Sequence, residues 1–317
     1  MGPEIPRIAA ADVLAGKADV ALAEAATGPG FLRLAGVTAA LDLPVDMPAR
    51  LLRFFDLPPA AIAALARSKF VPAHPNVYRG VFPLQPGETT YKEGIDIGPD
   101  LLRPEAVRPG DPLTEATPLP EEGALPGWRE EAAAWYGAME HLGAALVTGL
   151  ARGLGRDPAP LAAMFEGGIS TLRLIHYPER PEETLPADRA AVAVAGDARV
   201  VVGAAHVDSG FVTLLWQDDT GGLQAKGADG WIEVPPEPGG LAVNFGALLA
   251  DLTGGAVRAT EHRVLGGRAA RASIPFFFEP AVDAPIPLPT GAAPAYGDLL
   301  WSRMTRFVEF RGVDRQT

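Results

Sequence analysis

The sequence predicts a mainly β fold with a helical N-terminal half, in which an antiparallel sandwich or barrel is flanked by α-helices. From about residue 170, short runs rich in Val, Ile, Leu, Thr and Phe alternate with turn signals, as is typical of antiparallel strands. The preceding half contains Ala-rich and amphipathic stretches with helical spacing. Pro and Gly, 32 and 36 of 317 residues, indicate many turns, and a hydrophobic fraction of 48% is enough for a sizeable core.

The first third of the chain is the less regular part. Residues 9–27 are rich in Ala and predict a helix that ends at the Gly-Pro-Gly that follows. Residues 31–37 predict a short strand, and residues 49–68 predict a second helix that is interrupted or starts near its Pro-Pro pair. Residues 103–127 contain six prolines and few periodic apolar positions. We therefore expect an extended surface loop there.

The clearest helix is expected from about Trp128 to Leu154. Its apolar residues recur at three- and four-residue spacing, which places them on one face. They are Trp135, Met139, Leu142, Leu146 and Leu150. Glycines at its end and a following proline supply a stop. We expect this helix to be structural and to lie against a sheet.

The C-terminal half contains the predicted strands. They are expected at 171–177, 198–206, 210–217, 230–234, 240–245, 256–265 and 271–279. Nothing in the composition marks a linker, so we expect one domain over residues 1–317. Within it, a helix-rich part covers about 1–165, a β core about 166–285, and a C-terminal segment about 286–317. The last residues, 311–317, are polar, and we expect them to fray.

Composition excludes several classes of function. The chain has 27 Lys and Arg against 39 Asp and Glu, a net charge of −12, and no basic cluster, which argues against a nucleic-acid partner. It has no cysteine, so disulfides, thiolate metal sites and cysteine nucleophiles are excluded. No secretory leader pattern and no stretch of about 20 apolar residues is present, so we expect a cytoplasmic protein with no membrane contact. The oligomeric state does not follow from the sequence.

Two histidines and one aspartate are the candidate metal ligands. His206 and Asp208 lie two residues apart in AAHVDSGF, and residues i and i+2 of a strand point to the same face. His262 lies on another predicted strand. Two imidazoles and one carboxylate form the facial triad of non-haem iron(II) oxygenases, which leaves three positions open on an octahedral metal. A 2-oxo acid would fill two of these positions and dioxygen the third. Each of these residues alone is more commonly structural.

Arg271 and Ser273 are the third element. They follow His262 in ARASIPFFF and share one face of a predicted strand. An arginine fork matches a carboxylate with two parallel bonds, the hydroxyl adds a donor, and a buried cation needs an anion. The distal carboxylate of 2-oxoglutarate would meet this need, whereas a surface arginine at the start of a strand is the plain alternative.

The ordered motifs resemble the isopenicillin N synthase-like branch of the 2-oxoglutarate/Fe(II)-dependent dioxygenases, over nearly the whole chain. The matching segments in the first part are GPGFLRLAGV (28–37), YRGVFP (78–83), KEGIDIG (92–98) and RLIHYP (173–178). Those in the last part are HVDSGFVTLLWQDDTGGLQ (206–224), WIEVPPEPGGLAVNFGALL (231–249) and ATEHRVLGGRAARASIPFFFEP (259–280).

The resemblance implies a double-stranded β-helix, or jelly-roll, core. It implies that His206, Asp208 and His262 bind Fe(II), that Arg271 and Ser273 bind the carboxylate of the cosubstrate 2-oxoglutarate, and that Tyr177 contacts this cosubstrate. The expected reaction is the O2-dependent oxidation of a small organic substrate, by hydroxylation, desaturation or cyclisation, with release of succinate and CO2. No catalytic residue is expected beyond the metal ligands.

Two positions depart from the family pattern. Ile175 stands where many members have Asn, and Ala247 stands where many have Asp after the NxG turn. Neither is a ligand, but the first bears on how Tyr177 and the cosubstrate are held.

Three other readings stay open. An oxidase of the same fold, such as isopenicillin N synthase itself, would use Arg271 and Ser273 for a substrate carboxylate and consume no 2-oxoglutarate. A jelly-roll binding protein would hold a metal without turnover. A zinc hydrolase could use two His and one carboxylate but would leave the Arg-x-Ser pair unexplained.

The remaining histidines are expected to have no part in the site. His141 lies on the long helix, His74 lies in a loop, and His176 should point away from the barrel interior if its neighbour Tyr177 points inward.

Overall fold

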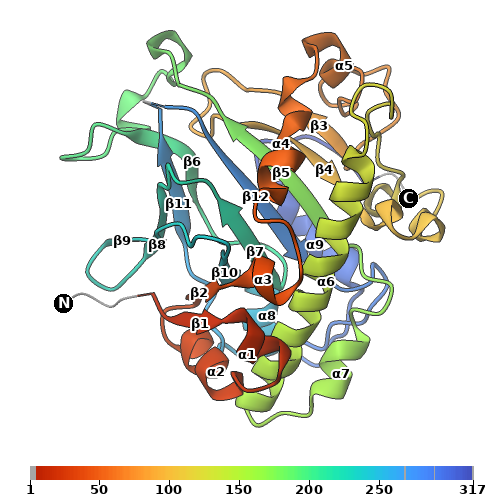
Figure 1. Ribbon diagram of the computed structural model, residues 1–317, viewed down its shortest axis with the longest axis vertical. Helices are drawn as coiled ribbons and strands as arrows, with labels where there is room; N and C mark the ends of the chain where they lie inside the picture. Colours follow the sequence, from red (N-terminus) through yellow and green to blue (C-terminus); the bar gives the residue numbers. More distant parts are fainter. Residues whose placement is uncertain (1–4, 268, 289, 316–317) are drawn as a thin grey trace.

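Two β-sheets form the centre of the computed structural model, which describes residues 5–267, 269–288 and 290–315. In Figure 1 the smaller sheet lies on the left and the larger sheet in the middle. The long helix α6 (Trp128–Gly153) lies to the right, on the side of the larger sheet away from the smaller one. The layers are therefore sheet, sheet and helix. A mainly β core flanked by helices is confirmed.

The larger sheet has eight strands within the described residues, in the order β1-β2-β10-β7-β12-β5-β4-β3. Their bounds are β1 (Arg7–Ala9), β2 (Phe31–Ala35), β3 (Gly80–Phe82), β4 (Glu93–Ile97), β5 (Thr171–Tyr177), β7 (Val212–Gln217), β10 (Leu241–Phe245) and β12 (Arg271–Phe278). Strand β1 pairs in parallel with β2, and the other pairs are antiparallel. The register places Arg271 opposite Tyr177, and Ser273 opposite Gln217.

The smaller sheet has the order β6-β11-β8-β9 within the described part of the chain. Its strands are β6 (Val200–His206), β8 (Leu223–Lys226), β9 (Trp231–Glu233) and β11 (His262–Gly266). Strands β6 and β11 are antiparallel, and His262 lies directly opposite His206. Two residues that are far apart in the chain are thus neighbours across one pair of strands.

Short helices surround these sheets. They are α1 (Ala10–Leu14), α2 (Asp19–Thr27), α3 (Val37–Ala40), α4 (Met47–Leu52), α5 (Pro59–Ala63), α7 (Pro158–Ala163), α8 (Ala247–Leu252) and α9 (Tyr296–Met304). Three-residue or four-residue 3-10 helices occur at Arg53–Asp56, Pro99–Leu101, Pro104–Ala106, Pro112–Thr114, Glu182–Thr184 and Arg189–Ala191. Helices α2 and α4 pack against α6.

The alternation of side chains along β12 separates two hydrophobic cores. Ile274, Phe276 and Phe278 belong to the core between the larger sheet and the helices, where the Phe276 ring meets Tyr136 of α6 edge to face at 4.9 Å. Gly143 of α6 allows close approach, since a Cβ there would lie 2.5 Å from the Phe278 ring. The second core lies between the two sheets. It contains Ile175, Tyr177, Val202, Leu223, Ala225, Ala242 and Val264.

Helix α6, β5, β10 and β12 lie where they were predicted, whereas several N-terminal expectations were wrong. The single helix expected over 9–27 is two helices, because the chain turns at Gly16, which has a φ of +67°. The helix expected over 49–68 is interrupted at its Pro-Pro pair as predicted, since α5 starts at Pro59, but the part before the pair divides further into α4 and a 3-10 helix. The loop over 103–127 is not all at the surface, since Leu113 is fully buried.

Other differences concern the C-terminal half. The strand expected over 256–265 starts at His262, and β8, α8 and α9 were not predicted. The expected fraying of residues 311–317 is wrong for Arg315, which forms ion pairs with Asp111 at 2.6 Å and Asp298 at 2.8 Å. Residues 316 and 317 lie outside the described residues.

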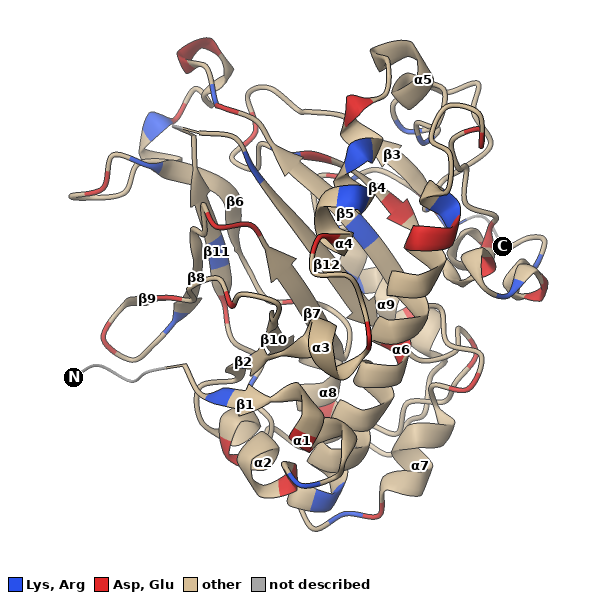
Figure 2. Ribbon diagram, viewed as in Figure 1, with Lys and Arg blue, Asp and Glu red and all other residues tan. Residues whose placement is uncertain are grey.

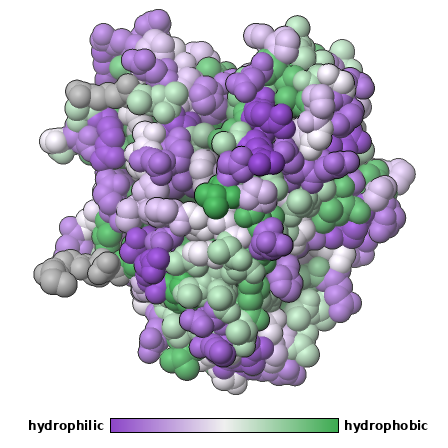
Figure 3. Space-filling view, in the orientation of Figure 1, coloured by the Kyte–Doolittle hydropathy of each residue, from purple (hydrophilic) through white to green (hydrophobic). Residues whose placement is uncertain are grey.

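The surface shows no large apolar face among the described residues. The exposed large hydrophobic residues are scattered: Val20, Val45, Leu102 and Val107. Figure 3 shows hydrophilic side chains over the upper part of one face and paler, less polar ones near the Ala-rich helices below. In Figure 2, basic and acidic residues are interspersed. None of the described helices combines the length and the apolar character needed to cross a membrane.

Candidate metal centre and adjoining cavity

His206, Asp208 and His262 come together between the two sheets. His206 is the last residue of β6, and His262 is the first residue of β11. Asp208 lies just beyond β6, in the connection to β7, so it does not share a strand face with His206 as expected. The ligand atoms of the three side chains lie within 4.8 Å of one another. The Oδ1 atom of Asp208 is 3.5 Å from Nε2 of His206 and 3.6 Å from Nε2 of His262.

Hydrogen bonds orient each of these side chains from behind. Nδ1 of His206 lies 2.8 Å from the carbonyl of Ala204, and Nδ1 of His262 lies 3.2 Å from the carbonyl of Thr260. These contacts place the proton on Nδ1 and leave Nε2 free to bind a metal.

Asp208 is held in a similar way. Its Oδ2 atom accepts hydrogen bonds from the Thr213 hydroxyl at 2.5 Å and from the Asn244 amide at 2.7 Å. Its Oδ1 atom faces the two histidines. One carboxylate oxygen is therefore fixed by the protein while the other is available to a metal. Thr213 on β7 and Asn244 on β10 were missed by sequence reasoning, although Asn244 belongs to the NFG segment that was noted.

The electrostatics of the triad suit a cation. Burial alone would raise the pKa of the Asp208 carboxyl, but the two histidines and the Thr213 hydroxyl outweigh it and hold this pKa well below its usual range. Burial and the nearby His206 lower the pKa of His262 to about 4. At neutral pH the site therefore presents a carboxylate and a neutral His262 imidazole. These are the protonation states that metal binding requires.

Arg271 and Ser273 are buried on the inner face of β12, 2% and 1% exposed. The guanidinium of Arg271 lies over the Tyr177 ring, 4.5 Å from its centroid, and its Nε donates to the carbonyl of Gly221 at 2.8 Å. Among the described residues, neither Nη1 of Arg271 nor Oγ of Ser273 has a hydrogen-bond partner. Two unpaired buried donors side by side fit a ligand carboxylate.

A cavity of about 710 Å³ opens beside the triad, with His206 and Asp208 in its wall. The C-terminal segment forms much of the opposite wall, from Leu300 on α9 to Arg311. The Phe307 ring meets the His206 ring edge to face at 5.5 Å. A volume of this size accommodates a small organic molecule. The role of the C-terminal segment in this wall was not foreseen from the sequence.

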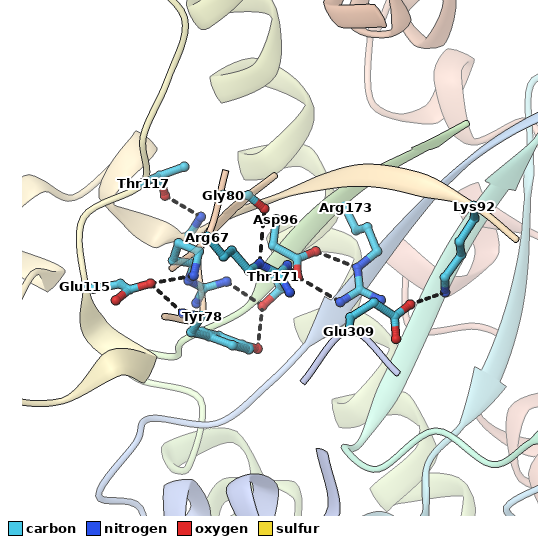
Figure 4. A network of polar contacts seen from close by, with 12 residues as sticks. Arg67, Tyr78, Gly80, Lys92, Asp96, Glu115, Thr117, Thr171, Arg173 and Glu309 are labelled. Carbon is cyan, nitrogen blue, oxygen red and sulfur yellow. Dashed lines mark hydrogen bonds and ion pairs between the residues drawn. The ribbon is translucent and has the colours of Figure 1, made fainter. Parts of the chain in front are cut away.

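A network of buried charges, shown in Figure 4, reaches this cavity through Lys92, Arg173 and Glu309. Asp96 on β4 is fully buried and pairs with Arg67, and with Arg173 on β5 through Nε at 2.5 Å. Farther along, Lys92 pairs with Glu309 of the C-terminal segment at 2.9 Å. Sequence reasoning missed this network, although Lys92 and Asp96 lie in KEGIDIG and Arg173 starts RLIHYP, because only the pairing of β4 with β5 brings these segments together.

The other histidines lie away from the triad. The ring of His176 faces Glu93 at 2.9 Å, whereas its neighbour Tyr177 is buried between the sheets, so the two side chains point to opposite sides as expected. His74 contacts the carbonyl of Ala66, and His141 is exposed on α6.

Comparisons with known proteins agree with this arrangement. Residues 168–280 match the family model of the 2OG-Fe(II) oxygenase superfamily. The chain is 30% identical over 250 residues to isopenicillin N synthase of Streptomyces clavuligerus, covering 74% of each chain. It is 31% identical over 239 residues to a 2-oxoglutarate-Fe(II) type oxidoreductase of Aspergillus fumigatus, covering 71% of this chain and 65% of the relative.

Solved structures also resemble this fold. The crystal structure of a full-length Neurospora crassa protein in complex with alpha-KG and 5-formyluracil superposes with a TM-score of 0.77 at 24% identity, covering 96% of both chains. The structure of JOX2 in complex with 2OG, Fe and JA superposes with a TM-score of 0.70 at 22% identity, covering 98% of this chain and 87% of that one. The jelly-roll architecture expected from the sequence is confirmed.

Proposed function

Since the chain belongs to the 2OG-Fe(II) oxygenase superfamily, we propose that His206, Asp208 and His262 are the residues that bind its Fe(II). The protein is an oxidoreductase that uses Fe(II), 2-oxoglutarate and O2 to oxidise a small organic substrate. The observation that carries the ligand assignment is the convergence of the three ligand atoms within 4.8 Å, each side chain held from behind by a hydrogen bond.

Arg271 and Ser273 would hold the distal carboxylate of 2-oxoglutarate. Their unpartnered Nη1 and Oγ atoms support this assignment, because a buried guanidinium is stable only beside an anion. Tyr177 would stack on the guanidinium and fix its direction. Ile175 lies on the same face of β5 as Tyr177. It would give this carboxylate site an apolar side chain where many family members have an amide.

The chain's own groups would divide the work of the reaction. The metal and cosubstrate together supply the oxidising chemistry, in which 2-oxoglutarate is converted to succinate and CO2. Asp208, which Thr213 and Asn244 hold in place, would supply a negative charge to the metal without having to move. The Phe307 ring packs against the His206 ring and would help to keep water from that side of the cavity.

We also propose that the chain is one domain, because the core between the larger sheet and the helices contains residues from Ile8 to Phe310. A small molecule is preferred over a nucleic acid as partner because the net charge is −12 and basic residues are dispersed (Figure 2). A cytoplasmic location stays a prediction.

The test is an anaerobic titration of the Fe(II) protein with 2-oxoglutarate, followed by measurement of succinate after O2 is admitted. We expect saturable 2-oxoglutarate binding and O2-dependent succinate, both lost in His206→Ala and Asp208→Ala. His141→Ala is the matched control, since this exposed histidine lies on α6. Full turnover in Asp208→Ala would refute the ligand assignment. Fe(II) binding without 2-oxoglutarate binding would favour an oxidase that seats a substrate carboxylate at Arg271.

A further inference from the structure

The cavity beside the triad differs in charge from the rest of the protein. The whole chain has 27 basic and 39 acidic residues. The cavity reverses this balance: five of its lining residues are basic and four are acidic. The basic ones are Lys92, Arg173, Arg303, Arg306 and Arg311. One of the acidic ones is Asp208, whose charge a metal would neutralise. The lining therefore favours a ligand that carries negative charge.

The basic residues of the mouth already have partners or face solvent. Arg303 pairs with Asp251 at 2.5 Å, and Arg311 pairs with Glu88 at 3.2 Å. Arg306 is exposed. The side chains of Arg303 and Arg311 are 23% and 61% exposed, against 14% for Lys92 and 12% for Arg173. Charges that reach solvent contribute less to affinity, because water and salt screen them. The two basic residues that are sheltered from solvent, Lys92 and Arg173, are left to define the chemistry of the cavity.

Arg173 is held rigidly with one side free. Its Nε and Nη2 atoms bind the two oxygens of Asp96, at 2.5 and 2.8 Å. The rings of Phe82 and Phe277 each lie 5.2 Å from its guanidinium carbon. Among the described residues Nη1 has no partner, and Arg173 lines the cavity. Pre-organised in this way, Nη1 can donate to a ligand with little loss of side-chain entropy.

The buried network is short of negative charge. It joins three cations, Arg67, Arg173 and Lys92, to two carboxylates, Asp96 and Glu309. Burial would raise the pKa of Glu309, but Lys92 and Arg173 hold it at about 2. Glu309 is therefore ionised at neutral pH, and its negative charge is included in this balance. A net positive charge sheltered from water costs free energy unless an anion accompanies it.

A neighbouring acid does not restore the balance at neutral pH. Glu279 also lines the cavity, and burial raises its pKa to about 8 against the opposing influence of Arg79 and Arg173. It is therefore largely protonated near pH 7. Its Oε2 atom has no hydrogen-bond partner within the described residues. A ligand anion remains the means by which the excess positive charge can be matched.

We propose that Lys92 and Arg173 form the subsite for a carboxylate of the substrate, so that this oxygenase acts on small carboxylic acids. The inference rests on the proposed function, since it takes the cavity beside the triad as the substrate site. The cavity also has apolar side chains at both places: the Phe277 ring lies 5.2 Å from the guanidinium carbon of Arg173, and the Phe307 ring lies 5.5 Å from the His206 ring. The substrate would then carry its acid group at Lys92 and Arg173 and an apolar body toward His206.

The test compares matched probes that differ only in charge. Hexane, cyclohexane and toluene skeletons would each carry a carboxylate, a carboxamide or an amine. Binding to the anaerobic Fe(II) protein is measured by the shift in thermal unfolding temperature with ligand concentration. Saturating 2-oxoglutarate is present, so that the proposed carboxylate site at Arg271 is occupied. We expect the carboxylates to bind about tenfold or more tightly than the amides of the same skeleton.

Variants locate the effect. Lys92→Met, with Lys92→Gln as a second variant in case the first folds poorly, should remove the preference for carboxylates. Lys17→Met makes the same charge change at an exposed position outside the cavity and should preserve it. Glu309→Gln adds net positive charge and should tighten carboxylate binding.

Several outcomes would overturn the proposal: amides or amines that bind as well as carboxylates, no binding by any probe at millimolar concentration, or an unchanged preference in the Lys92 variants. The visible absorption that 2-oxoglutarate acquires on chelating Fe(II) is recorded in every sample. If that absorption is present while carboxylates fail to bind, the subsite is refuted and the proposed function stands. If the absorption is missing from the wild type, the proposed function itself fails.

Discussion

Replacing Arg271 by Met should separate cosubstrate binding from folding. The guanidinium is 2% exposed, its Nε is engaged with the Gly221 carbonyl, and Nη1 has no partner among the described residues. A charge-assisted hydrogen bond contributes about 1.5–3 kcal/mol. Loss of a two-bonded carboxylate contact should therefore weaken 2-oxoglutarate binding by about 3 kcal/mol or more, roughly a hundredfold or greater rise in Kd. The 2-oxoglutarate affinity of Arg271→Lys should lie between those of the wild type and Arg271→Met, since lysine keeps the charge without the planar guanidinium.

The stability of the ligand-free Arg271→Met variant should change much less. The variant loses the Gly221 hydrogen bond and the contact with the Tyr177 ring, about 1–3 kcal/mol together. It also removes a buried cation that lacks an anion, which offsets this loss. We expect a net change within about 2 kcal/mol.

The assay is urea denaturation of the Fe(II) protein with and without 2-oxoglutarate. The wild type should gain about 2.7 kcal/mol at a hundredfold excess of ligand over Kd, and the variant should gain almost nothing. Wild-type affinity for 2-oxoglutarate in Arg271→Met would refute the assignment of this seat. Global unfolding of the ligand-free variant would refute the view that the cation is uncompensated.

Three further predictions concern buried polar groups. Thr213→Val removes one of the hydrogen bonds that fix Asp208, so metal affinity measured by chelator competition should fall about tenfold; unchanged affinity would contradict the role of this bond. Asp96→Asn should lower the free energy of unfolding in urea by about 3–5 kcal/mol, whereas Asp46→Asn, at an exposed pair, should leave it nearly unchanged; equal effects would contradict the reasoning. In the folded chain the pKa of Glu279 is about 8, whereas the unfolded chain ionises this group near 4.5. The free energy of unfolding of the wild type should therefore fall relative to that of Glu279→Gln as the pH rises from 5 to 8. Parallel pH profiles of the two proteins would contradict the raised pKa.

The parts of the fold that sequence reasoning predicted have strong local patterns. Helix α6 repeats its apolar residues over 26 positions, and β5 and β12 are rich in residues that favour strands. The expectation over residues 9–27 failed because Ala favours a helix without specifying where one ends. A single glycine at position 16, in the left-handed region, divides it.

The candidate site likewise contains residues that the sequence predicted and residues that it did not. The candidate metal triad and the Arg271-Ser273 pair were predicted because they lie in ordered motifs that resemble a known family, whereas each residue alone is more commonly structural. The charge network was missed because Asp96 and Arg173 are 77 residues apart, and only the pairing of β4 with β5 brings them together. Glu309 is farther still, on a segment with no motif. Such pairs are set by strand order, which composition and periodicity do not encode.

The alternation along β12 has a consequence for how this enzyme could change. The side of the strand that carries Arg271, Ser273 and Phe277 faces the proposed cosubstrate and substrate sites, and the side that carries Phe276 and Phe278 meets α6. Substitutions on opposite sides of a strand share few neighbours, so their effects should be nearly additive. Directed evolution could therefore vary position 277 to accept new substrates. Substitutions on the helix-facing side could stabilise the fold independently.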